Sequence, residues 1–221
     1  GLFAAFASLI SIDQRFYLAS FMYNALAIAI DSIDGIIARK ANVKKYGQKI
    51  DGALMDNIID FLTYTIIPTY FLYKTTLIPS EPWITTITIA AILLSSLFAF
   101  SNNNAKTKDH FFLGFPSYWN ILIFYLFIWN LPLAINLIII WICAILSFIP
   151  IKFIYPSRLD HLKPAKLKIP FTVSTILWGI ASAILFLTYP EVPPIITLYT
   201  YSYILIYTGL SLYNTTKLAS P

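Results

Sequence analysis

The sequence predicts an all-α, polytopic integral membrane protein, a helical bundle of about eight transmembrane helices that forms a single domain over residues 1–221. Hydrophobic residues make up 58% of the chain and charged residues only 11%, whereas about a quarter of a soluble domain is charged. The apolar runs have the length of helices, not of the roughly ten-residue alternating strands of an outer-membrane barrel. Basic residues gather in alternate connecting segments, which is typical of a chain that crosses a membrane repeatedly.

The spans follow from the apolar runs. We place them at residues 2–12, 15–38, 52–73, 83–102, 117–131, 134–151, 169–189 and 193–215. The first run offers about eleven apolar residues where a span needs about twenty, and the chain begins at Gly1 without a Met. We therefore expect the N-terminus to be incomplete. A signal peptide is the alternative, but the run has no basic n-region and no A-x-A cleavage site. In the third span, Pro68 is expected to kink the helix.

Orientation follows from the basic residues. If the spans alternate, one side of the membrane receives residues 39–50, 103–116 and 152–168 and Lys217, with nearly all of the Lys and Arg residues. Only Arg15 and Lys74 fall on the other side. Basic loops stay in the cytoplasm. Because anionic headgroups account for the net charge of +5, we expect membrane lipids and no nucleic acid as partners.

Half of the ten acidic residues lie between positions 31 and 60, at the cytoplasmic ends of the second and third spans. Asp31 and Asp34 share one helical face, and Asp56 and Asp60 share another, because residues three or four apart are neighbours on a helix. If the two helices pack antiparallel, the four carboxylates meet at one depth and repel one another unless a cation lies among them. Oxygen ligands favour Mg²⁺ or Mn²⁺, and Mg²⁺ usually shares its shell with substrate phosphates. The pattern predicts a metal–pyrophosphate site.

Small residues accompany these carboxylates. Gly35, Ala38 and Gly52 lie about one helical turn from an aspartate, which leaves a strip without side chains where a nucleotide could lie against the helix backbone. Close helix packing is the alternative explanation for small residues in a membrane. Arg39 ends the strip and could bind a phosphate through two hydrogen bonds, or it could serve only as a basic anchor at the cytoplasmic face.

The order Asp31-x-x-Asp34-Gly35-x-x-Ala38-Arg39, followed by Gly52-x-x-x-Asp56-x-x-x-Asp60, resembles the signature of the CDP-alcohol phosphatidyltransferases. The resemblance covers roughly residues 20–160, and the last two spans follow it in hydropathy only. Residues 40–51 make the gap between the two halves longer than is usual in the family. This gap is similar to that of a bacterial branch whose acceptor alcohol is choline. Three further stretches also resemble that branch, namely DNIIDFLTY at 56–64, KTKDHFFLGFPSYWN at 106–120 and IPIKFIYPSR at 149–158.

The resemblance implies a homodimer in the bacterial inner membrane, with an active site that faces the cytoplasm. It implies transfer of the phosphatidyl group of CDP-diacylglycerol to choline, with release of CMP. Two divalent ions held by the four aspartates would stabilise charge on the pyrophosphate. By analogy with the family, Asp60 accepts the proton of the choline hydroxyl, and the sequence does not separate this role from that of a metal ligand.

Choline carries a quaternary ammonium group without N–H donors, so we expect aromatic faces and a carboxylate around it. The candidates near the inner face are Tyr64, Phe115, Tyr118 and Trp119, with Asp109 or Asn120 as polar partners. An interfacial belt of aromatic residues is the alternative explanation for each ring. Lys152 and Arg158 are candidates for binding the lipid phosphate, unless they belong only to the basic inner loops.

Three other functions compete with this interpretation. Another member of the family could use serine, inositol or glycerol phosphate as acceptor. An intramembrane aromatic prenyltransferase also holds Mg²⁺-pyrophosphate on aspartate-rich helices, but the D-G-x-x-A-R element argues against it. A cation transporter would place its carboxylates near the membrane midplane, often in repeated halves, and the C-terminal half of this sequence has no matching acidic pair.

Overall fold

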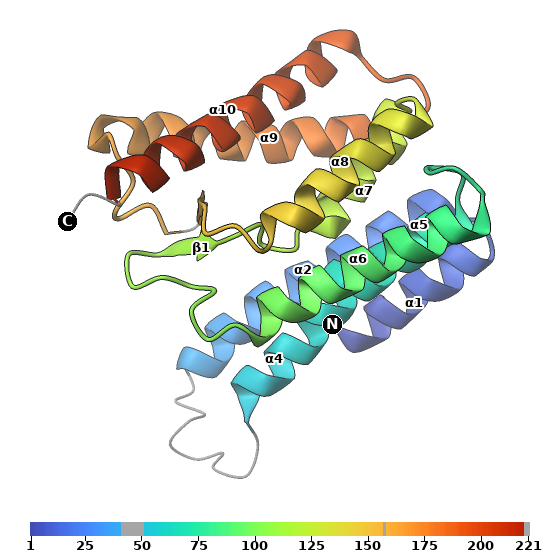
Figure 1. The fold of residues 1–221 in the computed structure, drawn as a ribbon, viewed down its shortest axis with the longest axis horizontal. Coiled ribbons are helices and arrows are strands. Elements are labelled where there is room, and N and C mark those ends of the chain that lie inside the picture. Colours follow the sequence, from blue (N-terminus) through green and yellow to red (C-terminus); the bar gives the residue numbers. More distant parts are fainter. Residues whose placement is uncertain (41–50, 157, 219–221) are drawn as a thin grey trace.

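The computed structural model describes residues 1–40, 51–156 and 158–218, and for residues 31, 32, 34–40, 53 and 218 it describes the backbone alone. Most of the described chain is helical (Figure 1). The helices are α1 (Leu2–Asp13), α2 (Tyr17–Lys40), α4 (Gly52–Phe61), α5 (Ile67–Lys74), α6 (Pro82–Ser101), α7 (Trp119–Trp129), α8 (Leu133–Leu146), α9 (Lys168–Thr188) and α10 (Pro194–Leu218). A π-helical turn η1 (Leu62–Ile66), a 3₁₀ turn η2 (Ala165–Leu167) and the strands β1 (Phe111–Leu113) and β2 (Lys152–Ile154) complete the elements.

Each predicted span coincides with helix, and α4, η1 and α5 continue into one another as the third span. Among the described residues, three segments are long and apolar enough to cross a membrane, namely Pro82–Ser101, Ala165–Thr188 and Pro194–Lys217. Large apolar side chains such as Phe3 and Leu187 point outward on the helices, where lipid, unlike water, favours them. The chain is therefore an all-α membrane protein, and the number of eight spans stays a prediction.

Helix α7 lies between two parts of the molecule (Figure 1). One side of α7 packs through Ile123 and Leu126 into a core that also contains Ile67 and Phe71 of α5. Its other side packs through Tyr125 against Leu185 of α9. Helix α7 thus joins the bundle formed by α1, α2, α4–α5 and α6 to the helix pair α9–α10.

The two strands form a two-stranded antiparallel sheet at one end of the molecule (Figure 1). We call this end the hairpin end, although α7 and α8 separate the two strands along the chain. Phe112 stands opposite Phe153, and α10 fixes β2 from behind, because Thr215 Oγ1 accepts from the Lys152 N–H at 2.8 Å. The Tyr207 hydroxyl donates to the Ile154 carbonyl at 3.0 Å. These contacts tie the C-terminal helix to β2, and the pairing of β2 with β1 extends the connection to the segment before α7.

Gly114 sets the direction in which the chain leaves β1 toward α7. Its φ is +82°, and a Cβ at this position would lie 2.5 Å from the carbonyl oxygen of Ser147. Glycine is the residue that tolerates both conditions. The Gly114 N–H donates to the Ile151 carbonyl at 2.9 Å, which holds the loop before α7 against the loop after α8.

The loops alternate between the two ends of the molecule as the basic residues predicted. The segments 102–118, 147–156 and 158–167 gather at the hairpin end, together with the start of α4 (Figure 1). Lys74 lies at the opposite end, where its Nζ atom is 2.6 Å from the Asp13 carboxylate. The segment 41–50, which also belongs to the predicted basic side, lies outside the described residues.

Candidate functional site

Helix α4 carries the second pair of predicted metal ligands at the hairpin end. Asp56 is exposed and Asp60, one turn further along, is half-buried. Gly52 is the first residue of α4, and a Cβ there would have no atom within 4 Å among the described residues.

The first pair of predicted ligands belongs to α2, whose backbone stays helical through residues 31–40. The side chains of Asp31, Asp34, Ala38 and Arg39, and the surroundings of Gly35, lie outside the described residues. The C-terminal end of α2 and the start of α4 lie at the same end of the molecule (Figure 1). Among the described side chains, no three potential ligands gather as a metal site. Asp56 and Asp60 supply oxygen donors on one helical face, and this donor set fits a hard divalent ion.

A π-helical turn follows Asp60 directly. The Ile67 N–H donates to the carbonyl of Leu62, five residues back, as it does in a π-helix. The carbonyl of Thr63 would next require an N–H from residue 68, but Pro68 has none. Asn24 of α2 supplies the missing donor, since its Nδ2 lies 3.2 Å from the Thr63 carbonyl oxygen. The irregularity expected near Pro68 is thus this π-turn, and α2 holds it in place.

Four aromatic side chains from three separate segments meet next to this turn, and we call them the aromatic cluster: Tyr64, Phe112, Tyr118 and Tyr155. The ring of Phe112 lies 4.6 Å from that of Tyr155 and 5.9 Å from that of Tyr118, measured between centroids. Tyr64 lies 6.1 Å from Tyr118. Each of the four is partly exposed. Tyr64 follows Asp60 by four residues where α4 continues into η1, so the cluster lies about one helical turn from the predicted catalytic carboxylate.

Three of the predicted choline ligands contact the helix core instead: Trp119 and Asn120 are buried, and Phe115 is partly exposed. Trp119 is 0% exposed, and its Nε1 donates to Ser96 Oγ at 2.7 Å. Asn120 is buried, and its Oδ1 accepts from the Ile121 N–H at 2.8 Å. Phe115 packs edge-on against Trp119. The structure therefore brings Tyr64 and Tyr118 together next to Asp60 and leaves these three residues as contacts of the helix core.

Asp109 and Lys152, predicted for two different substrates, are partners of each other. Lys152 Nζ donates to Asp109 Oδ2 at 2.8 Å across the strand pair. Partial burial opposes the charged form of Asp109, but hydrogen bonds from Lys152 and Thr107 outweigh it and lower the pKa of Asp109 below its ordinary value. Arg158 is exposed on the loop that follows β2, where it is accessible to a lipid phosphate.

Sequence reasoning did not single out Asn24, Phe112 or Tyr155. Asn24 carried a signal, because a polar side chain inside an apolar span needs a partner or a function. Phe112 and Tyr155 lie in stretches that support the family resemblance. The pairing of β1 with β2 that brings their rings together cannot be recognised from the local sequence.

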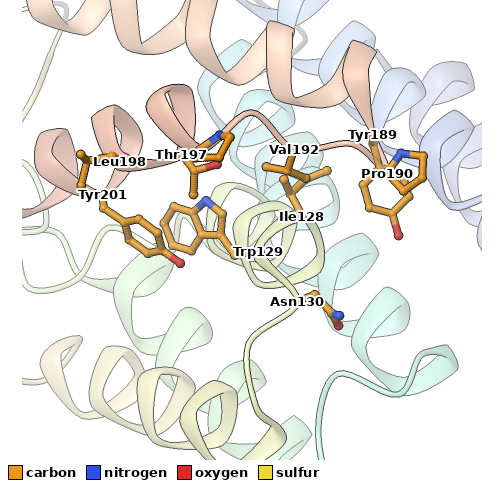
Figure 2. Close-up of a pocket in the computed structure, with 10 residues that line it drawn as sticks. Ile128, Trp129, Asn130, Tyr189, Pro190, Val192, Thr197, Leu198 and Tyr201 are labelled. Carbon is orange, nitrogen blue, oxygen red and sulfur yellow. The ribbon is translucent and has the colours of Figure 1, made fainter.

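A cavity of about 590 Å³ lies at the opposite end of the molecule (Figure 2). Its walls come from the end of α7, the α9–α10 connection and the start of α10, and the rings of Trp129 and Tyr201 stack there at 4.0 Å. None of the described site residues from the sequence lines it. We therefore place the candidate site at the hairpin end and not in this cavity.

Comparison with known proteins identifies the class. The family model for CDP-alcohol phosphatidyltransferase matches residues 1–149, and the chain belongs to this family.

Relatives in the family are phosphatidylcholine synthases. That of Legionella bozemanae is 42% identical over 94% of this chain and 96% of its own length. That of Legionella pneumophila is 41% identical over 94% of this chain and 82% of its own length. That of Borreliella burgdorferi is 43% identical over 82% of this chain and 76% of its own length. Membership in the family sets aside the prenyltransferase and the transporter.

Proposed function

We propose that this protein is a phosphatidylcholine synthase, which transfers the phosphatidyl group of CDP-diacylglycerol to choline and releases CMP. The observation that carries the proposal is the extent of the similarity to enzymes of that name. At 41% and 42% identity it covers 94% of the chain and so includes the helices beyond the family match at residues 1–149. The aromatic cluster beside Asp60 supports choline as the acceptor, because aromatic faces attract a quaternary ammonium group.

The aspartates divide the work at the reacting phosphate. Asp31, Asp34, Asp56 and Asp60 would hold two divalent ions, Mg²⁺ or Mn²⁺. When bound, such ions neutralise charge on the pyrophosphate. Asp60 accepts the proton of the choline hydroxyl while the oxygen attacks the phosphorus attached to diacylglycerol. The bond from that phosphorus to the CMP oxygen breaks, and CMP leaves with the electron pair.

The remaining predicted residues position the nucleotide and the lipid. Gly35, Ala38 and Gly52 would let the nucleotide approach the backbone of two helices, and Arg39 would bind one of its phosphates. The exposed Arg158 would neutralise the phosphate on the lipid side. We place the enzyme in a bacterial inner membrane as a multi-pass homodimer of single-domain chains, with the hairpin end in the cytoplasm, because the basic loops gather at that end.

The experiment is transfer of labelled choline by the purified protein supplied with CDP-diacylglycerol. It is run with Mg²⁺ or Mn²⁺ and with EDTA, in wild type and in Asp60→Asn. Serine, inositol and glycerol phosphate are offered as competing acceptors. We expect metal-dependent label in phosphatidylcholine that disappears in the variant. CMP release with another acceptor and none with choline would overturn the choline assignment, and no CMP release with any alcohol would overturn the transferase itself.

A further inference from the structure

The exposure of the aromatic cluster distinguishes it from the core. Buried rings such as Phe71 and Tyr125 are 1% exposed, because packed aromatic side chains exclude solvent. Tyr64, Phe112, Tyr118 and Tyr155 are partly exposed although they lie beside one another. An exposed group of adjacent aromatic rings offers an apolar surface that a ligand can contact.

A cation already lies over one ring of the cluster. Lys106 pairs with Phe112 across a β-bridge, and its Nζ atom lies 6.0 Å from the centroid of the Phe112 ring. This distance is within the range of a cation–π interaction. The face of the Phe112 ring therefore attracts positive charge. The Lys106 side chain is exposed, so it can move into the solvent and leave this face open to another cation.

The cluster also lies at the right place for an acceptor alcohol. Tyr64 follows Asp60 by four residues on the same continuous helix, and the Tyr118 ring lies 6.1 Å from the Tyr64 ring. In choline, two carbon atoms separate the ammonium nitrogen from the hydroxyl. A choline whose ammonium group contacts these rings can therefore direct its hydroxyl toward the Asp60 carboxylate.

We propose that the aromatic cluster binds the trimethylammonium group of the acceptor, and that Phe112 and Tyr155 are the residues that determine its preference for a quaternary amine. A trimethylammonium group has no N–H, so it loses no hydrogen bond when it leaves water for the aromatic faces. A primary ammonium group would need acceptors for three N–H donors, and the aromatic faces supply none of them. This inference rests on the proposed function and replaces Trp119, Phe115 and Asn120 as choline contacts.

The test compares acceptor kinetics in Phe112→Leu and Tyr155→Leu with those in Tyr155→Phe, which keeps the ring and loses only the hydroxyl. Tyr213→Leu serves as the matched control, since Tyr213 is an exposed aromatic residue on α10 outside the cluster. We expect the KM for choline to rise about 3- to 30-fold in both leucine variants. The KM for CDP-diacylglycerol should stay unchanged in every variant, and Tyr213→Leu should behave as wild type. The KM for choline should rise less in Tyr155→Phe, which keeps the aromatic face, than in Tyr155→Leu.

The second readout uses 3,3-dimethyl-1-butanol, the uncharged analogue of choline, as the acceptor. Wild type should prefer choline, and this preference should shrink in the leucine variants by the same factor as the KM rises. A general loss of folding would lower both rates and leave the preference unchanged. If the wild type makes phosphatidylcholine but the leucine variants keep both the choline KM and the preference, the inference about the cluster is wrong and the proposed function stands. If the wild type does not use choline, the proposed function fails first.

Discussion

Asn24 of α2 donates a hydrogen bond from Nδ2 to the carbonyl oxygen of Thr63, 3.2 Å away. Asn24 is 6% exposed, and the carbonyl it reaches is the one that the π-turn and Pro68 together leave without a backbone donor. The bond joins the helix that carries Asp31 and Asp34 to the helix that carries Asp56 and Asp60. It therefore holds the two halves of the predicted metal site at a fixed spacing.

Replacing Asn24 by Leu should lower both stability and turnover. The Thr63 carbonyl would be left without a partner, which costs about 1 to 2 kcal/mol for a buried group in a membrane protein. Because the lost contact lies next to Asp60, kcat should fall beyond what the loss of stability explains. The measurements are thermal unfolding in detergent and kcat at a temperature where the variant stays folded.

Asn136 provides the control for this variant. It is 0% exposed on α8 and donates from Nδ2 to the Leu77 carbonyl at 2.8 Å, far along the chain from Asp60. Asn136→Leu should lose similar stability and keep its kcat. Equal losses of kcat in the two variants would show that Asn24 has only a structural role.

Asp60→Asn should lower kcat by about 10² to 10⁴, the usual contribution of a general base. The amide retains the size of the side chain but neither accepts the proton nor ligates a cation as a carboxylate does. Asp160 is an exposed carboxylate on the loop between β2 and η2 and is not one of the predicted metal ligands, so Asp160→Asn should keep wild-type activity. Initial rates at saturating substrates and metal measure both variants, and a kcat for Asp60→Asn within about tenfold of wild type would exclude the base role.

The Asp109–Lys152 ion pair should make stability depend on pH in the acidic range. The folded-state pKa of Asp109 is below its ordinary value, so the contribution of the pair is present above about pH 4 and is lost as the pH falls through the folded-state pKa. The pair is partly exposed, so its contribution should not exceed about 1 kcal/mol. Thermal unfolding of wild type and Asp109→Asn should therefore differ at pH 7 and converge toward pH 3. A difference that stays constant with pH would contradict the charge pairing.

Lys106→Met should lower the KM for choline about two- to fivefold. The change removes a cation from the face of Phe112 and removes its repulsion of the substrate's ammonium group. Lys108→Met is the control, because Lys108 is an exposed lysine on the same loop. An unchanged KM in Lys106→Met, measured alongside that control, would show that Lys106 does not compete for the ring.

The sequence predicted the helices well because each span is a long apolar run, and a helix satisfies its own backbone in lipid. It predicted that Asp56 and Asp60 share a face because four-residue spacing is local. The local sequence pattern did not predict the π-turn, because that turn depends on Pro68 and on Asn24 from another helix. The strands were also missed, because three-residue strands almost 40 positions apart leave no local pattern. Trp119 was assigned to the wrong environment for a similar reason, because its partner Ser96 lies on α6.

The strand pair crosses the boundary of the family match. The family model ends at residue 149, β1 lies before that point and β2 begins after it at Lys152. A chain cut at residue 149 would keep every predicted aspartate and lose Tyr155, and with it one wall of the aromatic cluster. The predicted catalytic aspartates thus all lie before this boundary, whereas the proposed choice of alcohol depends on both sides of it, through Phe112 before and Tyr155 after.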